Sequence, residues 1–247
     1  MKLTVAGCGD AFGSSGRMQT TYLVDTAEGT VMIDCGATVT TALSKLGRDP
    51  NAIPFIVISH LHGDHFGGLI WIYIQALYAT KRTEPLTVFG PPGIETRFNA
   101  AAEALYPGCL GVNRKFVLKF VEMPTGAPVQ VGALSIQTFL VEHPSGAPSH
   151  ALRMTHRNKV LAFTGDSQWT ESLVACGKDA DLYMIECYKY ATRVNYHMSW
   201  LEIAPNLDRI GARRVMLTHM SDEMLAKQVE VKDPRILFAT DGLVVEI

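Results

Sequence analysis

The sequence lacks an excess of either charge. Its 22 Lys and Arg residues nearly balance 24 Asp and Glu residues, and the net charge is −2 with histidine neutral. Proteins with a broad nucleic-acid surface usually carry strong positive charge, so this balance argues against such a partner. Charged residues make up 19% of the chain and hydrophobic residues 47%. Since neither kind of charge is gathered in a block, the composition is that of an ordinary globular protein.

Cysteine is also scarce. The five cysteines are odd in number, widely spaced and without a C-x-x-C pair: Cys8, Cys35, Cys109, Cys176 and Cys187. This pattern argues against a disulfide framework and against a structural zinc knuckle. We expect at least the last three to be small, buried, apolar residues.

Long apolar runs are missing as well. Residues 66–79 form an apolar stretch that we interpret as a helix, and it is shorter than the roughly 20 residues that cross a bilayer. The first residues lead directly into a strand pattern at 3–6, without a signal-peptide core. We therefore expect a cytoplasmic protein with no membrane partner.

What the chain has is a dense group of metal-binding side chains. A short β-branched run at residues 55–59 predicts a buried strand, and it is followed by His60, His62, Asp64 and His65. In an extended loop the first two imidazoles would point the same way and the next two side chains elsewhere, which suits two neighbouring ions. Neutral imidazoles with one carboxylate favour zinc, whereas an all-oxygen set would favour magnesium or calcium. Simple solvation of a turn is the weaker alternative.

This His-x-His-x-Asp-His motif resembles the signature of the metallo-β-lactamase superfamily, a group of mostly hydrolytic metalloenzymes. The resemblance implies an α/β fold, a four-layer αβ/βα sandwich with two sheets face to face. We expect a single domain over residues 1–247, made of two α/β halves with a seam near 125–133. The implied cofactors are two divalent metal ions, zinc first, with manganese and iron left open.

Three strand patterns in the second half each end at a ligand-type residue: 134–141 before His143, 160–164 before Asp166, and 214–218 before His219. By resemblance, the metal ligands are His60, His62 and His143 for one ion, Asp64, His65 and His219 for the other, and Asp166 as the bridge. The resemblance also implies that Asp34 supports the ligand loop. We interpret His150 and His156 as structural or surface residues.

A glycine-rich loop at residues 7–16 follows the first strand pattern. It matches neither the dinucleotide fingerprint nor a P-loop, because the Lys and the helix are missing. We interpret its glycines as allowing close approach to neighbouring backbone, with Arg17 as a structural or anion contact.

A second chemical signal lies at Glu186 and His197. Glu186 ends a strand pattern, and a capping box at 199–202 after His197 predicts a helix that Pro205 kinks and Gly211 ends. This arrangement resembles the phosphodiesterase branch, which includes ribonuclease Z and the cyclic-ribose phosphodiesterase of the carbon–phosphorus lyase pathway. A solvated histidine beside a helix cap is the alternative.

Carried over residue by residue, the resemblance implies that Glu186 orients His197 as proton donor to the leaving oxygen. The predicted catalytic residues are these two and Asp64, with a metal-bridging hydroxide as nucleophile. Ribonuclease Z carries a transfer-RNA-binding arm between the residues equivalent to His143 and Asp166, whereas two strand patterns fill that interval here.

The predicted function is therefore a dinuclear metal-dependent phosphodiesterase acting on small or cyclic phosphodiesters. The alternatives are a ribonuclease Z-like tRNA 3′ endonuclease, or a lactonase, thioesterase or sulfatase of the same superfamily. An iron redox enzyme is less favoured, since that branch has a carboxylate at the position of His62. A non-catalytic binding protein is least favoured. The expected partner is a small-molecule phosphodiester, with nucleic acid not favoured and a homodimer left open.

Overall fold

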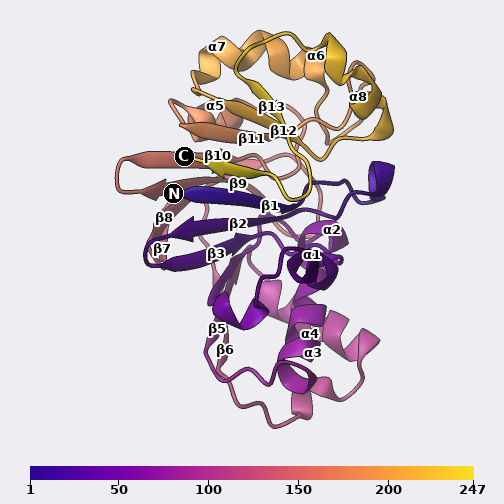
Figure 1. The fold of residues 1–247 in the computed structure, drawn as a ribbon, viewed down its shortest axis with the longest axis vertical. Helices are drawn as coiled ribbons and strands as arrows, with labels where there is room; N and C mark the ends of the chain where they lie inside the picture. The colour runs from indigo at the N-terminus through magenta and orange to yellow at the C-terminus, as the bar shows by residue number, and fades with distance from the viewer.

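A computed structural model describes residues 1–247, which form two seven-stranded sheets (Figure 1). In spatial order the first sheet contains β14 (Val244–Glu246), β1 (Lys2–Gly7), β2 (Thr21–Thr26), β3 (Gly29–Ile33), β4 (Phe55–Val57), β5 (Leu86–Gly90) and β6 (Leu118–Glu122). The second contains β13 (Ile236–Phe238), β12 (Val215–Thr218), β11 (Leu182–Glu186), β10 (Lys159–Phe163), β9 (Ser149–His156), β8 (Leu134–Val141) and β7 (Pro128–Val131).

Helices cover the outer faces of both sheets (Figure 1). The first sheet carries α1 (Val39–Lys45), α2 (Gly63–Phe66), α3 (Gly68–Tyr78) and α4 (Ile94–Leu105). The second carries α5 (Glu171–Gly177), α6 (Trp200–Ile203), α7 (Leu207–Ile210) and α8 (Asp222–Lys227). Short 3-10 turns lie at Ser14–Gly16, Pro50–Ala52, Cys109–Gly111, Ala204–Asn206 and Gln228–Glu230.

The core between the sheets explains why they pack face to face. Side chains of β1, β2 and β3 meet side chains of β8 to β12 in one buried apolar cluster. In β8, buried and partly exposed residues alternate over Leu134–Thr138, as expected of a strand with one buried face. Separate apolar clusters join each sheet to its helices. The four-layer αβ/βα arrangement predicted from the sequence is confirmed.

The chain crosses from the first sheet to the second between β6 and β7, and β14 returns to pair with β1. No helix has the length and apolar character that a membrane span requires. All five cysteines are buried and free, and these include Cys109, Cys176 and Cys187, for which burial was predicted.

The ligand-rich segment differs from the prediction of an extended loop. β4 ends at Val57, and α2 begins at Gly63, so Asp64 and His65 lie in a helical turn. His62 is the N-cap residue, with extended φ and ψ of −78° and 152°. The backbone changes from extended to helical at this point, and the His65 ring nevertheless lies 4.1 Å from that of His60, measured between centroids.

The strand pattern predicted at 134–141 forms β8, and Gly132, which has a φ of +56°, separates it from β7. The predicted helix after Ser199 is interrupted at Pro205 by the turn Ala204–Asn206, because proline cannot donate a helical hydrogen bond. Its capping box and its end at Gly211 are confirmed.

The glycine-rich loop runs as close to its neighbours as the sequence predicted. A Cβ on Gly7 would lie 2.1 Å from the carbonyl oxygen of Gln19, and a Cβ on Gly9 would lie 2.9 Å from the Cβ of Arg17. Arg17 donates through Nη1 to the carbonyl of Ala239 at 2.9 Å. Its contact is therefore a structural one between the two ends of the chain.

Candidate metal and active site

The predicted site residues gather where strands of both sheets end. Each follows or closes one strand: His60 follows β4, His143 follows β8, Asp166 follows β10, Glu186 closes β11 and His219 follows β12. Because neighbouring parallel strands bring their carboxyl ends to one edge, side chains far apart in sequence become neighbours. A cavity of about 130 Å³ lies at this edge, and His143, Asp166 and His219 are among the residues that line it.

The first subsite consists of three imidazoles, those of His60, His62 and His143. One ring nitrogen from each lies within 4.8 Å of the others. The closest pair is His143 Nε2 and His62 Nδ1, at 2.8 Å. Segments that follow strands of opposite sheets therefore bring three imidazole nitrogens around one point.

The second subsite consists of Asp64, His65 and His219. His219 Nε2 lies 3.1 Å from Asp64 Oδ2, and His65 Nε2 lies 3.4 Å from the same oxygen. All three residues are buried. This subsite therefore combines a carboxylate with two imidazoles.

Asp166 lies between the two subsites. Its Oδ2 is 3.9 Å from His60 Nε2 and 4.0 Å from His143 Nε2 on one side. It is 3.3 Å from His219 Nε2 on the other side, where Oδ1 is 3.3 Å from His65 Nε2. One carboxylate thus faces ligand atoms of both subsites.

The unpaired atoms of this cluster test whether the residues fit metal ions. Buried side-chain atoms without a hydrogen-bond partner include His60 Nε2, His65 Nε2 and Asp166 Oδ1. Buried polar atoms rarely lack a partner, and these point into the groups whose ligand atoms converge. Imidazole and carboxylate donors at such spacing fit divalent ions of the zinc type.

Asp34 fixes the orientation of the ligand loop. It accepts a hydrogen bond from His65 Nδ1 at 2.6 Å, and others from Ser59 N at 2.7 Å and Ser59 Oγ at 2.8 Å. Ser59 Oγ also lies 3.1 Å from His60 Nδ1. The buried carboxylate thereby holds His65 directly and His60 through Ser59, leaving both Nε2 atoms free to bind a metal. These contacts agree with the supporting role predicted for Asp34.

A backbone carbonyl orients His143 in the same way. His143 Nδ1 donates to the carbonyl of Tyr196 at 2.9 Å, so its Nε2 is the nitrogen left for a ligand. Pro144 follows directly, and proline restricts the preceding residue to extended geometry.

Electrostatics distinguish the two subsites. In the first, burial lowers the pKa of His143 to about 4. Burial and the neighbouring His65 lower the pKa of His60 well below its ordinary value. In the second, burial alone would lower the pKa of His219, but Asp166, Asp64 and Glu186 outweigh it and raise the pKa to about 9.

The carboxylates respond in the opposite direction. Burial would raise the pKa of Asp166, but His219 and His65 hold it well below its ordinary range. Burial would also raise the pKa of Asp64, but His65 and His219 hold it well below its ordinary range. Both acids are therefore ionised at neutral pH and available as ligands.

His197 lines the same cavity and pairs with Glu186 behind it. Glu186 is fully buried, accepts from Ser167 N at 2.8 Å, and hydrogen-bonds His197 Nδ1 through its other oxygen. The His197 ring packs 5.0 Å from that of His143 and 4.9 Å from that of Tyr188, measured between centroids. Glu186 thus fixes the imidazole and leaves Nε2 as its free nitrogen.

The charge of this pair follows from its burial. Burial, then Asp166, raises the pKa of Glu186. Burial would lower the pKa of His197, but the adjacent Glu186 raises it. Glu186 and His197 also belong to a ligand-type group with Asp166 and His219. However, the Glu186 oxygen nearest that group is already bonded to His197, which favours an orienting role over metal binding.

Sequence reasoning missed the cavity wall formed by Asp10, Ala11, Phe12 and Tyr188. The first three belong to the glycine-rich loop that we interpreted only as a close-packing segment. The available signal was position, since the loop follows β1 at the same edge of the sheet as the ligand loop.

The remaining two histidines lie outside the cluster. His150 is fully buried in β9, and its Nε2 lies 2.9 Å from Thr125 Oγ1. His156 pairs with Glu28 at 3.2 Å near the surface. Neither belongs to a convergent ligand group, in line with the structural or surface interpretation.

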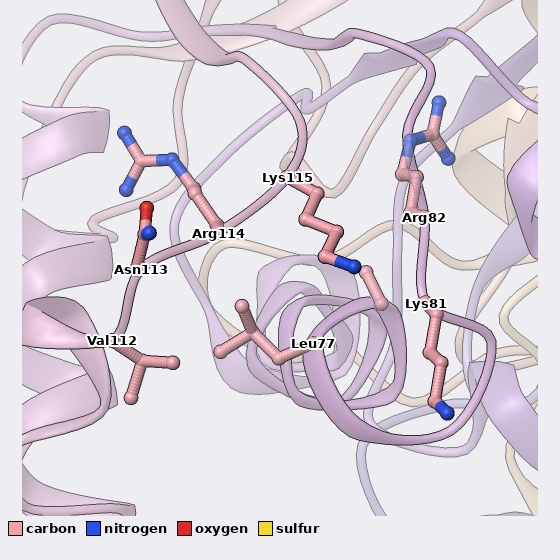
Figure 2. Close-up of a pocket in the computed structure, with 8 residues that line it drawn as sticks. Leu77, Lys81, Arg82, Val112, Asn113, Arg114 and Lys115 are labelled. Carbon is pink, nitrogen blue, oxygen red and sulfur yellow. The ribbon is translucent and has the colours of Figure 1, made fainter.

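A second cavity, of about 210 Å³, lies beside α3 and has a different character (Figure 2). Lys81, Arg114 and Lys115 line it with Leu77 and no acidic residue. It also contains no metal-ligand group. This cavity is therefore not a candidate hydrolytic centre.

Comparisons with known proteins agree with this fold. The probable metallo-hydrolase YhfI of Bacillus subtilis is 28% identical over 228 residues, covering 89% of this chain and 87% of that protein. Its crystal structure has a TM-score of 0.79 at 22% identity, covering 99% of this chain and 98% of that one.

Two other crystal structures share the fold. Human tRNase Z, short form, has a TM-score of 0.79 at 20% identity, covering 100% of this chain and 99% of that one. A diphosphatase of the PhnP family has a TM-score of 0.80 at 15% identity, covering 100% and 97%. At these identities, likeness of structure shows the metallo-β-lactamase fold alone.

The fold, the ligand groups and the curated relatives together identify a metallo-hydrolase of the metallo-β-lactamase fold. One family model matches almost the whole sequence, over residues 1–244, under the description Anti-Pycsar protein Apyc1. The chain belongs to the Anti-Pycsar protein Apyc1 family.

Proposed function

We propose that this protein is a metal-dependent phosphodiesterase that opens small cyclic phosphodiesters, with cyclic nucleotides as its substrate class. The family to which it belongs degrades cyclic nucleotides. The observation that carries the proposal is the fixed Glu186–His197 pair beside the two subsites. Hydrolysis of a phosphodiester needs a proton donor for the departing alkoxide, and this pair supplies one.

The first and second subsites would hold two divalent ions, with Asp166 between them. We propose zinc for both, because imidazole and carboxylate donors suit it. Such ions lower the pKa of a bound water to about 7 and draw in the phosphoryl oxygens. Asp34 and the carbonyl of Tyr196 keep the ligand nitrogens aimed at these positions.

His197 then acts on the leaving group. Its Nδ1 is held by Glu186, so Nε2 donates a proton to the departing oxygen as the P–O bond breaks. One water is consumed, and the ring opens to a phosphomonoester and a free hydroxyl. Glu186 keeps the imidazole in the tautomer and orientation that this donation requires.

Transfer RNA is a weaker substrate candidate. Between His143 and Asp166 the chain forms only β9 and β10, an antiparallel pair whose register begins at Lys159 opposite His156. No segment protrudes there to grip a long nucleic acid.

A substrate comparison tests the proposal. The zinc-loaded protein would be assayed on bis-p-nitrophenyl phosphate and on 3′,5′-cyclic nucleotides, beside a lactone, a thioester, an aryl sulfate and precursor tRNA. We expect turnover of the phosphodiesters, with a mononucleotide as product of the cyclic nucleotides. Selective turnover of the lactone, thioester or sulfate without phosphodiester hydrolysis would refute the proposal.

A further inference from the structure

Phe12 stands at the edge of the catalytic cavity with its side chain in solvent. It is 82% exposed, more than any other exposed large hydrophobic residue of the chain. It also lines the cavity that contains His62, His143 and His197. Removing an aromatic side chain from water is favourable, so an exposed ring at a binding site is suited to contact a ligand.

The backbone under Phe12 is held firmly. The carboxylate of Asp10, itself buried, accepts from Phe12 N at 3.2 Å, Ser14 N at 2.9 Å and Ser14 Oγ at 2.6 Å. The carbonyl of Ala11 accepts from Gln19 Nε2 at 3.0 Å. The ring is therefore presented from a fixed loop, which reduces the entropy lost when a ligand is bound.

The size of the cavity indicates that it encloses only part of the substrate. At about 130 Å³ it is smaller than the roughly 300–1,000 Å³ of pockets that enclose a whole small-molecule ligand. Its polar lining of imidazoles and carboxylates suits a phosphodiester with metal ions. A planar base attached to that phosphodiester must lie at the rim, where Phe12 is exposed.

We propose that Phe12 forms a nucleobase subsite, in which its ring stacks on the base while the cyclic phosphodiester occupies the metal cavity. The inference rests on the proposed function and adds to it the group that recognises the nucleoside part of the substrate. Stacking suits this position because a base presents an apolar face of the same shape as the ring.

The test compares a substrate that has a base with one that lacks it. For the zinc-loaded protein, kcat/KM is measured on adenosine 3′,5′-cyclic phosphate and on 1-O-methylribose 3′,5′-cyclic phosphate. The ratio of interest is kcat/KM for the nucleotide divided by kcat/KM for the methyl riboside. We expect Phe12→Ala to lower this ratio about tenfold, mostly by raising KM for the nucleotide. Phe12→Trp should keep the ratio at or above that of the wild type, whereas Phe12→Leu should lower it.

Matched controls separate stacking from bulk and folding. Tyr78→Ala removes another exposed aromatic side chain, on α3 and away from the metal cavity, and should leave the ratio unchanged. The thermal midpoint of Phe12→Ala should match that of the wild type, because the ring is exposed. An unchanged ratio in Phe12→Ala, or equal ratios for Phe12→Leu and the wild type, would overturn the inference.

Equilibrium binding tests the subsite independently of turnover. If the wild type hydrolyses neither substrate, the proposed function fails, but affinity for adenosine 5′-monophosphate against ribose 5-phosphate can still be measured. We expect Phe12→Ala to weaken binding of the nucleotide about tenfold relative to the sugar phosphate. Equal relative affinities in the two proteins would overturn the nucleobase subsite.

Discussion

The two metal subsites share a carboxylate, yet they solve the problem of holding a cation in different ways. The first offers three imidazoles, and burial keeps the pKa of His60 and His143 low, so both are uncharged at neutral pH and each keeps one nitrogen without a proton. The second is set among Asp64, Asp166 and Asp34, which raise the pKa of its own histidine, His65, well above normal although burial would lower it. The first subsite thus has uncharged imidazoles at His60 and His143, whereas the second combines carboxylates with a histidine whose pKa they raise.

Neither half of the chain supplies all the ligands of a subsite. Each subsite takes two ligands from the short segment after β4 and one from a strand end of the second sheet. Asp166, also from the second sheet, then faces both. The site therefore exists only when the two sheets pack together.

Removing the shared carboxylate should have the largest effect. We expect Asp166→Ala to lose both metal ions and to lower kcat/KM by about 10⁴-fold or more, since metal-assisted attack depends on both subsites. Metal analysis of the purified variant beside phosphodiester turnover would check this. A variant that retained two ions per chain would show that Asp166 does not join the subsites.

Removing one ligand at a time should show that each subsite holds its own ion. We expect His143→Ala and His219→Ala each to retain one metal ion per chain and to lose most phosphodiester turnover. The ions lost should differ, because the two residues face opposite sides of Asp166. Crystallographic anomalous scattering from each variant would locate the ion that remains. The same remaining position in both variants would contradict two separate subsites.

The Glu186–His197 pair should affect chemistry without affecting metal content. We expect His197→Ala to lower kcat on a phosphodiester by about 10²–10⁴-fold, as for loss of a general acid. Glu186→Gln should lower it less, because the imidazole would remain but lose its negatively charged partner. Metal content near that of the wild type in both variants is the control. Undiminished turnover in His197→Ala would exclude the proton-donor role.

Substitution of Asp34 should have a smaller effect, and it should affect the second subsite more than the first. It contacts His65 directly but reaches His60 only through Ser59. We expect Asp34→Asn to weaken metal binding at the second subsite by about 10- to 100-fold, and at the first subsite less. Competition with a chelator would measure both affinities. Equal weakening at the two subsites would contradict the hydrogen-bond arrangement.

His150 extends the comparison to a buried imidazole without a metal role. Burial lowers its pKa to about 4, so between about pH 6.5 and pH 4 the unfolded chain binds a proton that the folded chain does not. The free energy of unfolding should therefore decrease as the pH is lowered from about 6.5 to about 4, by about 3 kcal/mol from this group. Denaturant unfolding of His150→Gln should show a shallower pH dependence, with His156→Gln as surface control. Identical slopes in the wild type and His150→Gln would contradict this assignment.

The sequence predicted much of this arrangement because the signals were local or repeated. The ligand segment after β4 has a recognisable spacing, and the capping box at Ser199 and the glycine at Gly211 mark helix ends by backbone chemistry. His143, Asp166 and His219 were found because each follows an apolar strand pattern. Their distances, however, depend on the packing of two sheets.

What the sequence could not supply were features set by tertiary contacts. Asp64 and His65 lie in α2, where four residues form a helical turn between the ligand loop and α3. Phe12 and Tyr188 carry no motif, and only the meeting of the two sheets brings them to the same cavity. The backbone at Phe12 is held in turn by hydrogen bonds to Asp10, and no sequence pattern indicates these bonds.

We expect these residues to hold two divalent cations, one on either side of Asp166. Crystals of the zinc-loaded protein, measured on both sides of the zinc absorption edge, would test it most directly. We predict two anomalous peaks, one among His60, His62 and His143 and one among Asp64, His65 and His219. A single peak, or none at these positions, would contradict the account.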